Sequence, residues 1–217
     1  MPLATSSVIT SAIERSGLSV VAIFLLAIPG LSYLQWLQDP SLAQENGVLE
    51  WLQVSMILFA CVMHSGRAGQ LDRSSLLFVT HAGLALLTYS FALRELDFEQ
   101  FGSSPLWLLL EKSLRLIRTV LWLGFFMLMY FRMKVIFSQR AFLFRLPVVW
   151  MSLIGGLFLI AGGLFDRQVF SNIAQPSSRF AEEVLELNGY FMILAATFFR
   201  SATKPTAARV AHVGHVE

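Results

Sequence analysis

Six mainly apolar stretches constrain this chain more than any other feature of its sequence. A helix needs about 20 apolar residues to cross the hydrocarbon core of a bilayer, and each stretch is close to that length. We therefore predict an all-α polytopic membrane protein, a bundle of six transmembrane helices that forms a single domain over residues 1–217. The predicted spans are 18–37, 48–65, 74–93, 114–133, 145–164 and 181–199.

The composition supports a membrane protein and excludes several other classes. Hydrophobic residues make up 56% of the chain and charged residues only 14%, whereas soluble domains carry about 25% charged residues. Long apolar runs rich in Phe favour lipid-facing helices over a β-barrel, whose short strands alternate apolar and polar residues. The single cysteine, Cys61, excludes an internal disulfide and a Cys-based zinc site.

The charges are divided unequally between the two sides of this six-span arrangement. Eleven of the fourteen acidic residues lie at the first, third and fifth connections or the helix ends beside them, and ten of the sixteen basic residues lie on the other side. Cytoplasmic loops collect Lys and Arg. We therefore expect the N-terminus (1–17) and a flexible tail (201–217) to be cytoplasmic, in a bacterial inner membrane. The basic residues are spread over several helix ends, which argues against nucleic-acid binding.

In three predicted helices, polar residues lie along one face. Each row starts at the acidic outer end of its helix. Residues at helical spacing share a face, so each set forms a stripe. The stripes are Glu50, Gln53, Ile57, Cys61 and His64 on the second span, Ser74, His81, Thr88 and Glu95 on the third, and Glu183, Glu186, Tyr190 and Thr197 on the sixth. Charged groups within a bilayer usually face protein partners or water. We therefore predict a bundle with a polar interior.

The outer helix ends carry more carboxylates than arginines, and this excess favours binding of a cation. Oxygen ligands suit Mg²⁺, Mn²⁺ or Ca²⁺, and the candidate metal ligands are Glu50, Glu95, Asp97, Glu183 and Glu186. Arg94 and Arg118 are candidates for contact with an anionic substrate group such as phosphate. The same side chains are also consistent with ion pairs and headgroup contacts that only fix the positions of the helices.

Three short acidic motifs resemble those of a group of bacterial polytopic inner-membrane proteins of unassigned activity. They are residues 45–51 (ENGVLEW), 94–98 (RELDF) and 182–186 (EEVLE). The resemblance covers about residues 45–199 and implies acidic motifs at three helix ends. A looser likeness is to the alkaline-ceramidase type of membrane hydrolase. That family holds zinc with several histidines, whereas only His64 and His81 lie in the spans here.

The pattern leaves two functions open. The first is a membrane binding or accessory protein whose outer carboxylate and arginine cluster binds a cation, a lipid headgroup or a partner subunit, including a second copy of the chain. The alternative is a metal-assisted membrane hydrolase or transferase that acts on a lipid or lipid-linked substrate at the outer interface. In that enzyme Glu95 or Glu183 would be the base and His81 a further catalytic candidate. Six spans without a pair of broken helices argue against a transporter.

Overall fold

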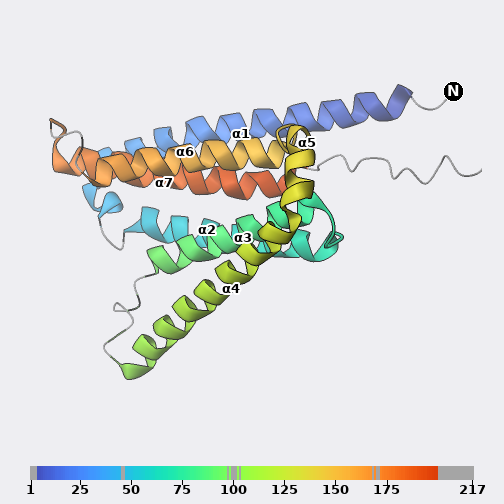
Figure 1. The fold of residues 1–217 in the computed structure, drawn as a ribbon. Helices are drawn as coiled ribbons and strands as arrows, with labels where there is room; N and C mark the ends of the chain where they lie inside the picture. The colour runs from blue at the N-terminus through green and yellow to red at the C-terminus, as the bar shows by residue number, and fades with distance from the viewer. Residues whose placement is uncertain are drawn as a thin grey trace, which may run out of the picture.

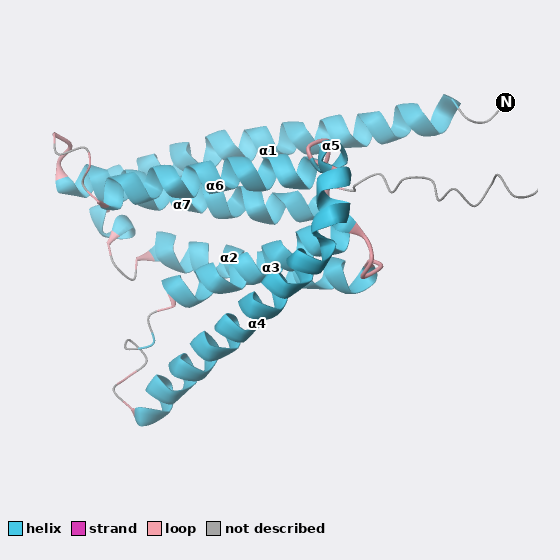
Figure 2. Cartoon of the chain, viewed as in Figure 1, coloured by secondary structure: helices cyan, strands magenta, loops and turns pink. Residues whose placement is uncertain are grey.

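The computed structural model describes residues 4–44, 47–96, 98, 102, 104–167, 169 and 172–199, with side chains from Ser19 onwards. Within these ranges the chain is helical and contains no β-strand (Figure 2). The long helices are α1 (Ala4–Gln38), α2 (Val48–Gln70), α3 (Leu76–Glu95), α4 (Pro105–Ser138), α6 (Pro147–Asp166) and α7 (Gln175–Ala195). Short helical segments are η1 (Pro40–Ala43), α5 (Arg140–Leu143) and η3 (Ala196–Phe198). The predicted all-α fold is confirmed.

Local sequence chemistry sets several helix ends. The side chain of Ser104 accepts a hydrogen bond from the backbone N–H of Leu106, and Pro105 occupies the first helical position of α4. Proline suits this position because its missing N–H would have no partner inside the helix. Ser75 caps α3 in the same way by accepting from the N–H of Phe78. These caps fix where α3 and α4 begin.

Five helices are long and apolar enough to cross a membrane, judged by length and composition: α1 from Ser19, and all of α2, α3, α4 and α6. Helix α7 is not among them, although it contains most of the predicted span 181–199. Helix α1 begins at Ala4, so it continues through most of the segment predicted as an N-terminal extension. Residues 201–217 lie outside the described part of the chain.

Consecutive long helices run in opposite directions along the molecule (Figure 1). One end therefore gathers the end of α1, the start of α2, the end of α3, the end of α6 and the start of α7. We call it the outer end, because it carries the acidic helix ends predicted to face outward. The opposite end holds the connection between α2 and α3. There the N–H and hydroxyl of Ser74 donate to Asp72 and hold the pKa of that carboxyl below its ordinary value.

Helix α7 occupies the centre of the bundle and packs against α6, α2 and α1. The contact with α6 depends on three glycines that let the two backbones approach closely. A Cβ added to Gly155 would lie 2.7 Å from the carbonyl oxygen of Gly189, and one added to Gly162 would lie 2.9 Å from Cγ of Glu186. Small residues at such crossings are typical of helix contacts in lipid.

Helix α4 lies at the edge of the bundle and packs mainly on α3. All of α4 is described, and none of its residues is buried. Its N-terminal half turns away from α2 and α3 (Figure 1). Several polar contacts attach it to the rest. Among them, Trp122 Nε1 donates to Ser90 Oγ at 2.9 Å, Arg132 Nη1 donates to the carbonyl oxygen of Ser74 at 3.2 Å, and the Tyr89 hydroxyl donates to the carbonyl oxygen of Leu114 at 3.1 Å.

Candidate functional site

The polar stripes of α2, α3 and α7 face one another inside the bundle. Most of their members are buried, namely Gln53 and His64 on α2, His81 and Thr88 on α3, Glu183, Glu186 and Tyr190 on α7, and Thr197 on η3 directly after it. The prediction of a polar interior is confirmed for these residues. It is wrong for two others: Cys61 faces a separate cavity between α2, α3 and α4, and Ser74 is exposed ahead of α3.

Arg94, Glu95, Glu186 and Tyr190 form a hydrogen-bonded group that we call the outer network. Arg94 donates through Nη2 to Oε1 of Glu95, to Oε1 of Glu186 at 2.9 Å and to the hydroxyl of Tyr190 at 3.1 Å. The Tyr190 hydroxyl in turn donates to Oε1 of Glu95 at 2.8 Å. One guanidinium thus joins the last turn of α3 to two successive turns of α7. Charge-assisted hydrogen bonds of this kind are stronger than neutral ones.

Glu183 is held separately, by α2 and by its own helix. Gln53 Nε2 donates to Oε2 of Glu183 at 2.8 Å and to its backbone carbonyl oxygen at 2.9 Å. Arg179, one turn earlier on α7, forms an ion pair with Oε1 at 3.4 Å. The side chain of Gln53 is fully buried, and its Oε1 atom has no hydrogen-bond partner among the described residues. The amide therefore serves mainly as a donor to Glu183.

His64 and His81 form a second polar layer, the imidazole pair, deeper in the bundle. Their Nδ1 atoms are 2.9 Å apart, and Nε2 of His64 lies 3.1 Å from the carbonyl oxygen of Ile193. A carbonyl only accepts, so neutral His64 carries its proton on Nε2 and accepts at Nδ1. His81 must then donate from Nδ1. An apolar cluster separates the imidazole pair from the outer network. It consists of Ile57, Ala92 and the ring of Tyr190.

The outer end remains acidic after these contacts are made. Among the described residues it carries seven carboxylates but three arginines. The carboxylates are Asp39, Glu50, Glu95, Asp166, Glu182, Glu183 and Glu186, and the arginines are Arg94, Arg167 and Arg179. Glu182 is half-buried and interacts electrostatically with the carboxylates of Asp166 and Glu186 as well as with Arg179 and Arg94. Negative groups on α6 and α7 thus face each other with too few arginines to neutralise them.

The predicted site residues are only partly brought together. Glu95, Glu186 and Arg94 meet in the outer network, and Glu50, half-buried in the first turn of α2, interacts electrostatically with Glu183. Arg118 lies on α4 near Tyr89 and takes no part in the ion pairs of the described residues. His81 belongs to the deeper pair. Asp97 lies outside the described residues.

The metal prediction gains no support from this arrangement. Among the described residues, no three His, Cys, Asp or Glu side chains are grouped so that they could hold a metal ion. The sequence reasoning also missed the parts played by Gln53 and Arg179 as partners of Glu183. The signal for Arg179 was its position four residues before that carboxylate, the spacing of a helical ion pair.

The chain has no match among protein-family models, curated proteins or solved structures. The resemblance of its acidic motifs to bacterial inner-membrane proteins therefore stays a prediction.

Proposed function

We propose that this chain is a six-span inner-membrane accessory protein, with both termini in the cytoplasm, that binds a positively charged group of another membrane component at its outer end. The observation that carries the proposal is the excess of carboxylates over arginines around the start of α7. Such an excess favours a bound cationic group, which lowers the repulsion between neighbouring carboxylates.

The position of α7 supports the proposal of a sixth span. Its charged residues exclude it from the helices that are apolar enough to face lipid, yet it packs between α6, α2 and α1 and runs opposite to α6. Polar side chains inside a membrane bundle are tolerated where neighbouring helices supply partners. Gln53 and Arg94 are such partners for Glu183 and Glu186. With α7 as a span, both termini fall on the basic side.

An ammonium or guanidinium group suits this place better than a metal ion. A metal needs several ligand atoms that converge on one point, and the described residues contain no such group. A lipid amine or a basic side chain of a partner subunit needs only nearby carboxylates that can accept its hydrogen bonds. Asp166 is exposed and Glu182 half-buried, so both can be reached at the outer interface.

Native mass spectrometry of protein extracted in a mild detergent tests the proposal. We expect the wild type to retain an amine-containing lipid or a partner chain, and Glu182→Gln to retain several-fold less. Glu111→Gln is the matched control, because Glu111 lies on α4 and pairs with Arg115. Equal retention by all three proteins, or no bound component in any of them, would contradict the proposal. Metal analysis of the same samples distinguishes a bound Mg²⁺, Mn²⁺ or Ca²⁺ ion.

The alternative of a metal-assisted enzyme is supported by one feature, the fixed hydrogen-bond donors around Glu95 and Glu183. A carboxylate held in position by such donors can act as a general base. If the protein is an enzyme, we expect Glu95→Gln and Glu183→Gln to abolish turnover of a lipid substrate with little loss of thermal stability. For an accessory protein, the same changes lower the melting temperature or release the bound component.

A further inference from the structure

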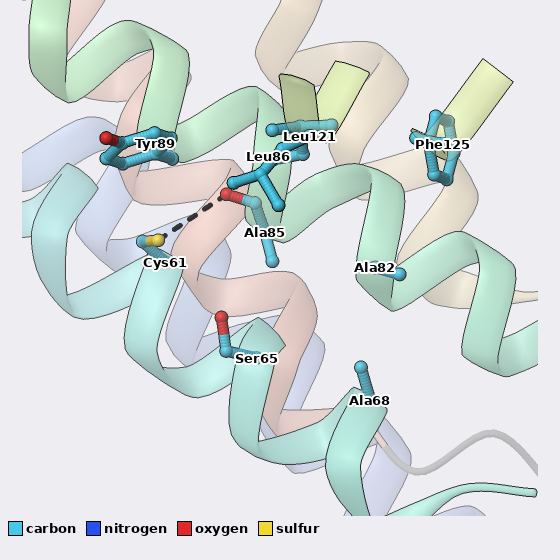
Figure 3. Close-up of a pocket in the computed structure, with 9 residues that line it drawn as sticks. All are labelled: Cys61, Ser65, Ala68, Ala82, Ala85, Leu86, Tyr89, Leu121 and Phe125. Atoms are coloured by element: carbon cyan, nitrogen blue, oxygen red, sulfur yellow. Dashed lines mark hydrogen bonds between the residues drawn. The ribbon is translucent and has the colours of Figure 1, made fainter. Parts of the chain in front are cut away.

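A cavity separate from the outer network lies between α2, α3 and α4. Its volume is about 420 Å³ and it is partly open to the surroundings. Its lining is Cys61, Ser65 and Ala68 from α2, Ala82, Ala85, Leu86 and Tyr89 from α3, and Leu121 and Phe125 from α4. Figure 3 shows these side chains around one space. We call this cavity the α4 crevice, and its volume falls within the range of small-molecule sites.

Small side chains create the crevice. Cys61, Ser65 and Ala68 recur at helical spacing on α2, and Ala82 and Ala85 do so on α3, so the two helices present short side chains to the same space. Helix α4 approaches α3 closely at Gly83. A Cβ added to this glycine would lie 2.8 Å from the ring of Phe125. The thiol of Cys61 donates to the carbonyl oxygen of Ala85 at 3.4 Å. The space between is therefore largely apolar.

The membrane is the surrounding medium of this crevice. All of its lining residues lie in α2, α3 and α4, which are long and apolar enough to span a bilayer. Helix α4 also turns its large apolar side chains outward, including Leu116, Val120 and Leu123. An opening at this level meets hydrocarbon chains rather than water. The shape and position therefore suit a lipid acyl chain.

Arg118 lies beyond the crevice on its outer side. It precedes Leu121 by three residues and Phe125 by seven, so the three share one face of α4. It interacts electrostatically with Tyr89, whose hydroxyl donates to the carbonyl oxygen of Leu114 at 3.1 Å. Arg115 is already paired with Glu111 at 2.7 Å, whereas Arg118 forms no ion pair among the described residues. A cationic side chain therefore lies next to an apolar crevice, as lipid recognition requires.

We propose that the α4 crevice binds one acyl chain of a phospholipid and that Arg118 contacts the phosphate of its anionic headgroup. Arginine suits this contact because its planar donors match phosphate oxygens. The proposal is independent of the cationic group at the outer end of α7, because it uses a different face of α3. Helix α4 then packs on the bundle partly through a bound lipid.

Photocrosslinking tests this proposal. The full chain is reconstituted in phosphatidylcholine vesicles that contain a small share of phosphatidylglycerol with a photoreactive group on one acyl chain. We expect crosslinks in the segments 82–89 and 121–125. Ala85→Phe places an aromatic ring in the crevice and should reduce them roughly tenfold, the equivalent of about 1.4 kcal/mol. Leu58→Phe, on an exposed face of α2, is the control and should leave them unchanged.

The headgroup contact is tested by exchanging the labelled lipid. Wild-type protein should crosslink labelled phosphatidylglycerol several-fold more than labelled phosphatidylcholine, and Arg118→Gln should remove that preference. Lys112→Gln, an exposed cation on the same helix, should retain it. If Arg118→Gln keeps the full preference, the assignment of the phosphate to Arg118 is wrong.

Two other outcomes would overturn the lipid site. One is undiminished crosslinking in Ala85→Phe; if that variant does not fold, Ala82→Leu provides the same measurement with a smaller side chain. The other is a crosslink between two copies of the chain at Leu121 or Phe125 in place of one to lipid, which would identify the occupant as a second protomer.

Discussion

Helices α7 and α4 reverse the usual relation between hydrophobicity and burial. Helix α7 carries Arg179, Glu182, Glu183 and Glu186, yet eleven of its 21 residues are buried. Helix α4 is 34 residues long and apolar enough to span a membrane, yet none of its residues is buried. In lipid an apolar side chain gains little from moving inward, because lipid chains are as apolar as leucine. A charged side chain gains much, because it finds partners there.

The two helices are also attached by different means. Helix α7 is joined to α6 by backbone contacts at Gly155 and Gly189, to α2 by a buried hydrogen bond and to α3 by a partly buried one. Helix α4 is joined to its neighbours at a few points, among them Trp122 with Ser90 and Arg132 with Ser74. We therefore expect equivalent changes to destabilise the protein at α7 and to have little effect at α4.

The largest effect is expected from a side chain placed between α6 and α7. Gly155→Val should destabilise the protein by about 3 kcal/mol or more, since its Cβ would lie 2.7 Å from a backbone oxygen that cannot move independently. Gly156→Val is the matched control, because no atom lies within 4 Å of a Cβ at that position. Thermal unfolding in detergent compares them. Equal melting temperatures for the two variants would show that the helices do not cross at Gly155.

Arg94→Gln should have a smaller effect than Gly155→Val. It leaves Glu95 and Glu186 without their cation. Loss of one partner from a buried pair costs about 3–5 kcal/mol. We expect about 1–2 kcal/mol, because 53% of the Arg94 side chain is exposed. Arg115→Gln on α4 removes an exposed pair with Glu111 and should cost about 0.5 kcal/mol or less. Similar shifts in melting temperature for both variants would show that the outer network stabilises the protein no more than an exposed ion pair does.

Gln53→Leu should destabilise the protein by about 1–2 kcal/mol. The change removes the neutral donor that satisfies Glu183. Gln53→Glu should destabilise the protein more than Gln53→Leu does, because it adds a second carboxylate beside that of Glu183. Melting curves of the two variants in the same detergent check this order. If Gln53→Leu is as stable as the wild type, the amide does not hold Glu183.

The smallest effect is expected on the outward face of α4. Leu123 is 66% exposed, so Leu123→Ala should change stability by less than about 0.5 kcal/mol in a lipid environment. Ile193→Ala on α7, at a position 1% exposed, should cost about 2–5 kcal/mol. Unfolding measured in lipid nanodiscs compares the two. A cost for Leu123→Ala close to that of Ile193→Ala would mean that a protein partner, rather than lipid, covers this face.

Much of the interior was predictable from helical spacing. The stripes of α3 and α7 placed Thr88, Glu95, Glu186 and Tyr190 on inward faces. The structure buries Thr88, Glu186 and Tyr190 and joins Glu95 to Tyr190. Spacing did not predict the position of Cys61, which lines the α4 crevice. A helix with neighbours on two sides has two inward faces, and periodicity along one chain does not distinguish them.

The sequence by itself determined the helices, their apolar lengths and the accumulation of acidic residues at one end, because these depend on local composition and on the order of residues. Only the tertiary structure decided which carboxylates share a cation. Arg94 reaches Glu186 across 92 positions of sequence, and Gln53 reaches Glu183 across 130. Such pairs depend on the rotation of each helix about its axis and on the distance between the helices. Both are set by contacts such as that of Gly155 with Gly189, which no single stretch of sequence contains.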